Sequence, residues 1–321
     1  MRPGRRRLLS PVLALLALSA GAVQAQPYKL SVNYEGPPAV AREIERAFEA
    51  FRGDVLSFVS LPAGTPADVD RLAATADIVW GGGDSLYRKL LSDGRVQPYA
   101  SSELASLDGR YPAIDPSIPV SGVEATVIAY VPGPAAPASL PARWRDLLEP
   151  RWKGLLILRR PSSDADAPAA TAIARSLDWS FLEALAAQRP LAAASDDEAL
   201  SRLAAGEALA AIVPYHAVTQ ARTPLEVIWP SDALVTAPRP IAILKQDRRP
   251  AMLTGMAEQL IDYVMSADGQ AIGRRHGLFP TRLGTPPPQG AAPLAAGAEA
   301  GWLRPQPADL RERLARLFGG R

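Results

Sequence analysis

The stretch Ala76-Asp77-Ile78-Val79-Trp80-Gly81-Gly82-Gly83-Asp84-Ser85 joins a short apolar strand to a loop of three glycines and then to a helix. The helix is indicated by Leu86, Leu90 and Leu91, which recur at helical spacing before Gly94. A strand that ends in such a loop and leads into a helix is typical of α/β proteins, whose ligands collect beyond the carboxyl ends of parallel strands. We therefore expect the glycine loop to lie at the edge of a binding site.

The residues upstream of this loop repeat the alternation of strand and helix. Alternating apolar residues predict strands over 29–34 and 54–61, and helical spacing predicts helices over 37–51 and about 66–74. The order β-α-β-α-β favours an α/β fold with a largely parallel sheet.

Downstream, the alternation continues on both sides of a Pro/Ala/Gly-rich passage at 132–141, which suits a crossing from one lobe to another. The sequence predicts strands over 125–131, 155–158 and 209–213, helices over 167–176, 180–187, 196–205, 252–265 and 267–275, and a return crossing over 233–244. After Thr285 the composition shifts to Pro, Ala and Gly, which predicts an irregular surface segment before a last helix over 308–318.

The N-terminus is typical of an exported protein. Four arginines within residues 1–7 precede an apolar run over 8–22 and the small-residue triplet Val23-Gln24-Ala25. This pattern predicts a secretory signal peptide that is cleaved after Ala25. The apolar run is broken by Pro11 and is shorter than the roughly 20 residues of a membrane-spanning helix.

Composition excludes several classes of function. Four of the 35 Lys and Arg lie in the signal peptide, so 31 remain against 33 Asp and Glu, and the mature chain is mildly acidic. Because no basic patch is interleaved with aromatic residues, nucleic acid is not an expected partner. The chain has no cysteine, which excludes disulfides, thiolate metal sites and a lipid-modified N-terminal Cys.

Several segments, in order along the chain, resemble one family. Residues 144–154, Trp-Arg-Asp-Leu-Leu-Glu-Pro-Arg-Trp-Lys-Gly, are similar to its segment W-D-L-L-D-P-K-W-K-G-K-I, and residues 204–212 are similar to its run A-x-G-E-A-A-I-G. Residues 263–270 are similar to F-L-L-S-P-E-G-Q, and Phe279-Pro280-Thr281-Arg282 stands in place of the usual Y-P-V-R. The chain thus resembles the extracellular solute-binding proteins of ferric-iron and related ABC importers, the cluster II type of periplasmic binding protein.

The resemblance implies a two-lobed α/β fold, the periplasmic binding protein type II fold, with hinge strands between two parallel-sheet lobes. We expect a signal peptide over 1–25, the first part of lobe 1 over 26–128, lobe 2 over 129–238, and over 239–321 a return to lobe 1 with the C-terminal helices. It also implies a periplasmic monomer without catalytic activity, which closes around a small-molecule or metal ligand and delivers it to a separate ABC permease in the inner membrane.

Three loops are candidates for ligand contact. The glycine loop offers the backbone of Gly82 and Gly83, with Asp84 and Ser85 at the start of a helix whose positive end favours carboxylate, phosphate or carbonate. Asp84 and Ser85 could equally serve only as helix caps. A second loop, where many relatives have Ser-Gly-Thr, carries Ser162, Ser163 and Asp164. Its hydroxyls suit a ligand, but the charge of Asp164 disfavours an anion, and a capped helix start explains the loop equally well.

The third loop holds Glu35, a candidate carboxylate ligand for a metal ion. Tyr215 falls where iron-binding relatives carry adjacent tyrosines, and His216 occupies the neighbouring position. Glu35, Tyr215 and His216 are therefore candidates for a metal site that holds Fe(III) or another metal with a synergistic anion. The loss of the second tyrosine counts against ferric iron, and an ordinary hydrogen bond is a simpler role for His216.

The ligand stays open between a metal ion with an anion, a small organic or phosphorylated anion, and a cationic metabolite. Two other functions compete with transport. A ligand-sensing subunit for a membrane receptor kinase would use the same clamp. A secreted hydrolase fits poorly, because the chain has no Gly-x-Ser-x-Gly or His-Glu-x-x-His motif and only two histidines.

Overall fold

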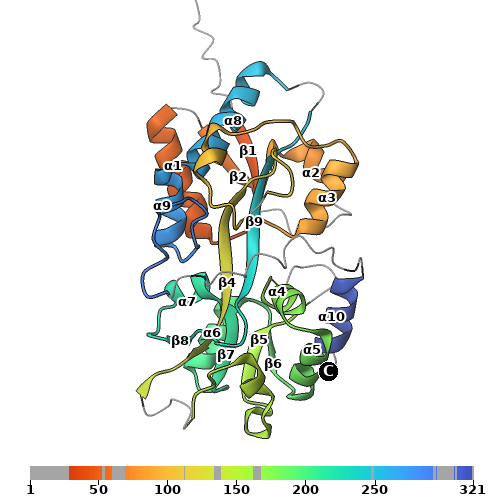
Figure 1. The fold of residues 1–321 in the computed structure, drawn as a ribbon, viewed down its shortest axis with the longest axis vertical. Helices are drawn as coiled ribbons and strands as arrows, with labels where there is room; N and C mark the ends of the chain where they lie inside the picture. Colours follow the sequence, from red (N-terminus) through yellow and green to blue (C-terminus); the bar gives the residue numbers. More distant parts are fainter. Residues whose placement is uncertain are drawn as a thin grey trace, which may run out of the picture.

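The computed structural model describes residues 29–52, 55–59, 69–111, 113–133, 139–161, 168–246, 249–291, 294, 307 and 309–319. Within these residues, a nine-stranded mixed sheet runs through two lobes in the order β2-β1-β3-β9-β4-β7-β5-β6, and β8 pairs with β4. The two-lobed α/β fold predicted from the sequence is confirmed (Figure 1).

Two long strands connect the lobes. β4 (Val120–Tyr130) and β9 (Val235–Ile243) pair antiparallel and run side by side from one lobe into the other (Figure 1). All eleven residues of β4 are buried, since β4 has neighbours on both sides and helices over its faces. The crossing therefore occurs within continuous strands, so the hinge and the cavity described below share the same backbone.

Lobe 1 contains β1 (Lys29–Tyr34), β2 (Val55–Val59), β3 (Ile78–Trp80) and the carboxyl half of β9. β1 runs parallel to β2 and β3, whereas β3 pairs antiparallel with β9. Its helices are α1 (Pro38–Arg52), α2 (Val69–Thr75), α3 (Asp84–Ser92), α8 (Ala251–Met265) and α9 (Ala267–Arg275). The periodic apolar residues of α1 predicted from the sequence, among them Val40, Ile44 and Phe48, lie in the core.

Lobe 2 contains β5 (Leu156–Arg159), β6 (Leu191–Ala193), β7 (Ala210–Pro214) and β8 (Glu226–Ile228). β5 runs parallel to β6 and β7, and β7 pairs antiparallel with β4. Its helices are α4 (Pro168–Ser176), α5 (Trp179–Ala187), α6 (Asp196–Ala204) and the short α7 (Tyr215–Thr219). Trp144 and Trp152 are fully buried in the core of this lobe.

The C-terminal helix α10 (Leu310–Phe318) packs against α4 and α5 of lobe 2 (Figure 1). Its Leu310 and Leu314 complete the core of that lobe, and the Arg313 guanidinium lies 4.1 Å from the centre of the Trp179 ring. The segment over 239–321 therefore returns to lobe 1 with α8 and α9 and then comes back to lobe 2.

Most elements lie where the sequence predicts them, but the short helix α7 and two short strands were not predicted. β6 and β8 have three residues each, too few for a periodic pattern. β4 begins five residues before the predicted strand, because Ser121 and Gly122 interrupt the apolar run. None of the helices in the described part of the chain combines the length and the apolar character that a membrane span requires.

Candidate functional site

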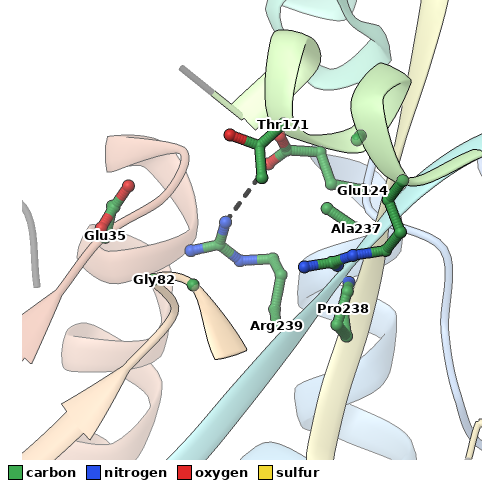
Figure 2. A pocket seen from close by; sticks show the side chains of 10 residues that line it. Glu35, Gly82, Glu124, Thr171, Ala237, Pro238 and Arg239 are labelled. Carbon is green, nitrogen blue, oxygen red and sulfur yellow. Dashed lines mark hydrogen bonds and ion pairs between the residues drawn. The ribbon is translucent and has the colours of Figure 1, made fainter. Parts of the chain in front are cut away.

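A cavity of about 50 Å³ lies where the two lobes meet the crossing strands. Residues from both lobes and from the hinge line it (Figure 2). Lobe 1 contributes two loops, β4 and β9 contribute their central residues, and α4 covers the cavity from lobe 2. The lining residues are Glu35, Gly82, Gly83, Glu124, Thr171, Ala172, Arg175, Ala237, Pro238 and Arg239.

Arg239, on β9, extends its guanidinium into the middle of this region (Figure 2). Its Nη1 donates to Glu124 Oε2 at 3.2 Å, and its guanidinium carbon lies 5.6 Å from the centre of the Tyr34 ring. Burial opposes the charge, but Tyr34, Glu124 and Glu35 more than offset this and raise the pKa of Arg239. The guanidinium is therefore charged although the residue is only 6% exposed.

Two glycine loops make room for this side chain. A Cβ on Gly36 would lie 2.1 Å from Arg239 Nη2, and a Cβ on Gly81 would lie 2.5 Å from it. Among the described residues, Nε and Nη2 of Arg239 have no hydrogen-bond partner. Leaving N–H groups of a buried cation unpaired costs free energy, so their position in the cavity wall points to a ligand that accepts from them.

Glu124, on β4, connects Arg239 to lobe 2. Its Oε2 lies 3.4 Å from His216 Nδ1, and its side chain is 5% exposed. Burial and the nearby Arg239 lower the pKa of His216, and the attraction of Glu124 only partly opposes them. The imidazole is therefore neutral at neutral pH, so the charge of Glu124 is balanced by Arg239.

The glycine loop brings backbone donors to the same cavity. Gly81 and Gly82 have φ values of +88° and +86°, in the left-handed region that favours glycine. The N-cap of α3 is Gly83, which has no side chain that could accept hydrogen bonds from the N–H groups of the first turn. Since Gly82 and Gly83 line the cavity, the positive end of α3 begins at its wall.

The structure brings three of the predicted ligand residues, Glu35, Gly82 and Gly83, into the cavity wall. Asp84 and Ser85 form the first turn of α3, where Ser85 is exposed. Ser162, Ser163 and Asp164 lie outside the described residues.

The structure does not bring Tyr215 into the cavity wall. Its hydroxyl donates to the carbonyl of Gln289 at 2.7 Å, and its ring packs against Trp229 and Phe279 at centroid distances of 5.0 and 6.4 Å. His216 lies at the start of α7, beside Glu124. Glu35, Tyr215 and His216 are thus not assembled as a ligand set, and within the described ranges no group of three or more His, Asp and Glu could hold a metal ion.

Four polar lining residues, Glu124, Thr171, Arg175 and Arg239, are absent from the sequence prediction. Two of these four residues have sequence features from which a role in the site could have been predicted. Glu124 is the one charged residue in the apolar run 120–130, and Arg239 stands between two prolines in the predicted return crossing. A single charged residue in a buried strand needs a partner of opposite charge. Glu124 on β4 and Arg239 on β9 are such partners for each other.

The fold matches solved structures of periplasmic binding proteins. AfuA from Actinobacillus pleuropneumoniae, solved with fructose-6-phosphate bound, is 18% identical, with a TM-score of 0.71 over 90% of this chain and 96% of that one. Iron-bound HitA from Pseudomonas aeruginosa is 18% identical, with a TM-score of 0.70 over 91% and 99%. The apo ferric ion-binding protein A from Pasteurella haemolytica is 15% identical, with a TM-score of 0.69 over 91% and 96%.

No curated protein matches the sequence. A family model described as bacterial extracellular solute-binding protein matches residues 73–304, which include both crossing strands and most of the cavity lining. By this match, and with a fold that agrees, the chain belongs to the family of bacterial extracellular solute-binding proteins.

Proposed function

We propose that this chain is the periplasmic component of an ABC importer, which captures a small solute by an anionic group and delivers it to an inner-membrane permease. The observation that carries the proposal is Arg239, a buried cation in the cavity wall with two nitrogens that make no hydrogen bond to the described residues. Carboxylate or phosphate oxygens would accept from these nitrogens in charge-assisted hydrogen bonds.

Other groups around the cavity support an anionic ligand. Arg175 of α4 adds a second guanidinium, and Thr171 adds a hydroxyl from the same helix. The backbone of Gly82 and Gly83, together with the positive end of α3, is suited to anion oxygens. A volume of about 50 Å³ holds roughly three to five water molecules, which is the size of one carboxylate or phosphate group.

Position also supports capture by closure. The cavity is lined by both lobes and by the strands that join them, so a ligand bound there contacts every part that moves in a hinge motion. The same closure would serve a sensor for a membrane receptor kinase. Membership of the solute-binding family favours transport.

A ferric ion with a synergistic anion is the second candidate. It is favoured by Glu35 and Glu124, which place two carboxylates in the cavity wall. The hydrogen bond from the Tyr215 hydroxyl to the Gln289 carbonyl counts against a ferric ion, because Tyr215 is the tyrosine that the sequence predicts as an iron ligand.

Native mass spectrometry of the mature protein purified from periplasm tests the proposal. We expect an adduct with the mass of a small organic or phosphorylated anion. Arg239→Lys should lose the adduct, because lysine keeps the charge but not the planar fork of donors. Arg249→Lys is the matched control, since the Arg249 side chain is only 4% exposed and pairs with Asp77 at 3.1 Å outside the cavity lining.

An adduct with the mass of a metal ion would replace the anion proposal by the metal one. An organic adduct that survives Arg239→Lys as well as it survives Arg249→Lys would remove Arg239 from the site.

A further inference from the structure

The two crossing strands are paired irregularly at the position of Arg239. The register of β4 against β9 shifts between Val120 and Val123. Two residues of β4, Ser121 and Gly122, therefore lie opposite the single residue Arg239 of β9. An extra residue of this kind forms a β-bulge, which interrupts the ladder and redirects a side chain. The bulge thus lies opposite the residue that brings a buried cation to the cavity.

The sequence around Arg239 weakens the ladder further. Arg239 lies between Pro238 and Pro240, and neither proline has an N–H that could donate to β4. The carbonyl of Pro240 accepts from the Gly81 N–H at 2.8 Å, which ties the backbone after Arg239 to the glycine loop. The carbonyl of Arg239 itself has a different donor, which comes from the bulge.

That donor is the side chain of Ser121. Its hydroxyl donates to the Arg239 carbonyl at 2.8 Å and accepts from the indole N–H of Trp80 at 2.7 Å. Its own carbonyl accepts from Gln270 Nε2 at 2.7 Å, and all four residues are buried. One serine hydroxyl therefore joins the backbone of Arg239 to the strand that leads into the glycine loop.

We propose that Ser121 is a positioning residue of the anion site, whose hydroxyl fixes the backbone from which Arg239 extends its guanidinium into the cavity. This inference rests on the proposed capture of an anionic group by Arg239. Ser121 does not line the cavity, so it acts through Arg239. A shift of the Arg239 backbone would move the guanidinium, because the hydrogen bond to Glu124 holds it at Nη1.

NMR of the ligand-free mature protein tests the role of Ser121. The Nε–H signal of Arg239 is identified as the one that Arg239→Lys removes. In the parent protein we expect this signal to show the heteronuclear NOE of a rigid group, because the backbone of Arg239 is fixed. In Ser121→Ala the signal should shift and its NOE should fall, whereas Ser121→Thr, which keeps a hydroxyl, should restore both.

Thr281→Val is the matched control. The Thr281 hydroxyl is also buried and donates to a backbone carbonyl of β4, that of Val120, at 2.7 Å. Thr281→Val and Ser121→Ala each remove one such hydrogen bond, so both should lower the free energy of unfolding to a similar extent. Only Ser121→Ala should change the Arg239 signal, which separates a loss of positioning from a loss of stability.

Titration with inorganic phosphate and with acetate, followed at the same signal, measures the effect on binding. For the anion that binds, Ser121→Ala should weaken the affinity about five- to tenfold, and Thr281→Val should weaken it by less than about twofold.

An Arg239 signal or an anion affinity that Ser121→Ala leaves unchanged would overturn the positioning role. So would equal changes in Ser121→Ala and Thr281→Val, since these would follow from lost stability alone. If neither anion shifts the signal in the parent protein, the capture of an anion at Arg239 fails, and the ligand-free spectra still decide whether Ser121 positions Arg239.

Discussion

Asp196 is the residue at which pH should act most directly on stability. It is the first residue of α6, with a side chain 17% exposed and Oδ2 4.0 Å from Arg159 Nη1. Burial raises the pKa of Asp196 from 3.8 to about 6; Arg159 opposes the rise, and the charges of Glu124 and Asp197 add to it. The folded protein therefore binds this proton more tightly than the unfolded chain does.

The sign of the pH dependence follows from this order of pKa values. The cost of the charged carboxylate is fully present above pH 6, reaches at most about 3 kcal/mol, and disappears as the pH falls below about 4. Asp196→Asn should therefore raise the free energy of unfolding by about 1–2 kcal/mol at pH 7.5, since the gain is reduced by the lost attraction to Arg159. Urea unfolding at pH 7.5 and at pH 4 measures it, and an equal effect at both values would contradict the assigned cause.

The glycine loop between β3 and α3 allows a graded test at the level of an element. Gly81, Gly82 and Gly94 all have positive φ, but their surroundings differ. A Cβ on Gly94 would meet nothing within 4 Å, one on Gly82 would meet Glu35 Oε2 at 3.4 Å, and one on Gly81 would meet the Glu35 carbonyl oxygen at 2.1 Å.

Alanine substitution should follow that order. Gly94→Ala should cost about 1 kcal/mol, the strain of the left-handed backbone alone. Gly82→Ala should cost slightly more, and it should also reduce the adduct that native mass spectrometry detects, because the methyl group enters the cavity wall. Gly81→Ala should cost several kcal/mol, since the loop that holds Arg239 has to move. Urea unfolding gives the ranking, and a Gly81→Ala variant as stable as Gly94→Ala would show that the loop is not close-packed.

These elements also show how far the sequence predicts the site. The apolar pattern shows where β1 and β3 end, and the loops that follow them contain Glu35, Gly82 and Gly83. That these residues lie together at one edge of the sheet could therefore be predicted. The pairing of Glu124 with Arg239 could not, because it depends on the register of two strands 115 residues apart, with a register shift between Val120 and Val123. The sequence predicts Tyr215 as a ligand residue, whereas in the structure its hydroxyl donates to the Gln289 carbonyl, an acceptor 74 residues away that the sequence pattern does not indicate.

At the scale of the whole molecule, the lobes are joined by the same sheet that carries the cavity. β4 and β9 contribute Glu124 and Arg239 at their middle, between the lobe 1 cores and the lobe 2 cores. Phe279 of lobe 1 exchanges two backbone hydrogen bonds with Val123, both at 2.8 Å, and packs against Trp229 beyond β8. A ligand at Arg239 would therefore contact the strands that join the two lobes.

The C-terminal helix tests whether each lobe depends on its own core. Leu314 of α10 is 1% exposed and packs into the core of lobe 2. The two helices that precede α10 in the sequence, α8 and α9, belong to lobe 1. Leu314→Ala should lower the free energy of unfolding by about 2–4 kcal/mol, because the apolar contact is lost and a cavity is left. Leu283→Ala, at a leucine that is 59% exposed, is the control and should change it by less than about 0.5 kcal/mol.

Hydrogen exchange locates the effect of Leu314→Ala. Amides of α4 and α5, which contact α10, should exchange faster in the variant, while amides of α1 and α8 in lobe 1 should keep their protection. This outcome would mean that α10 stabilises the lobe that covers the ligand, so loss of α10 packing should also loosen Arg175 and Thr171 on α4. Faster exchange spread equally over both lobes would instead mean that the continuous sheet makes the molecule a single cooperative unit, in which the place of α10 does not matter.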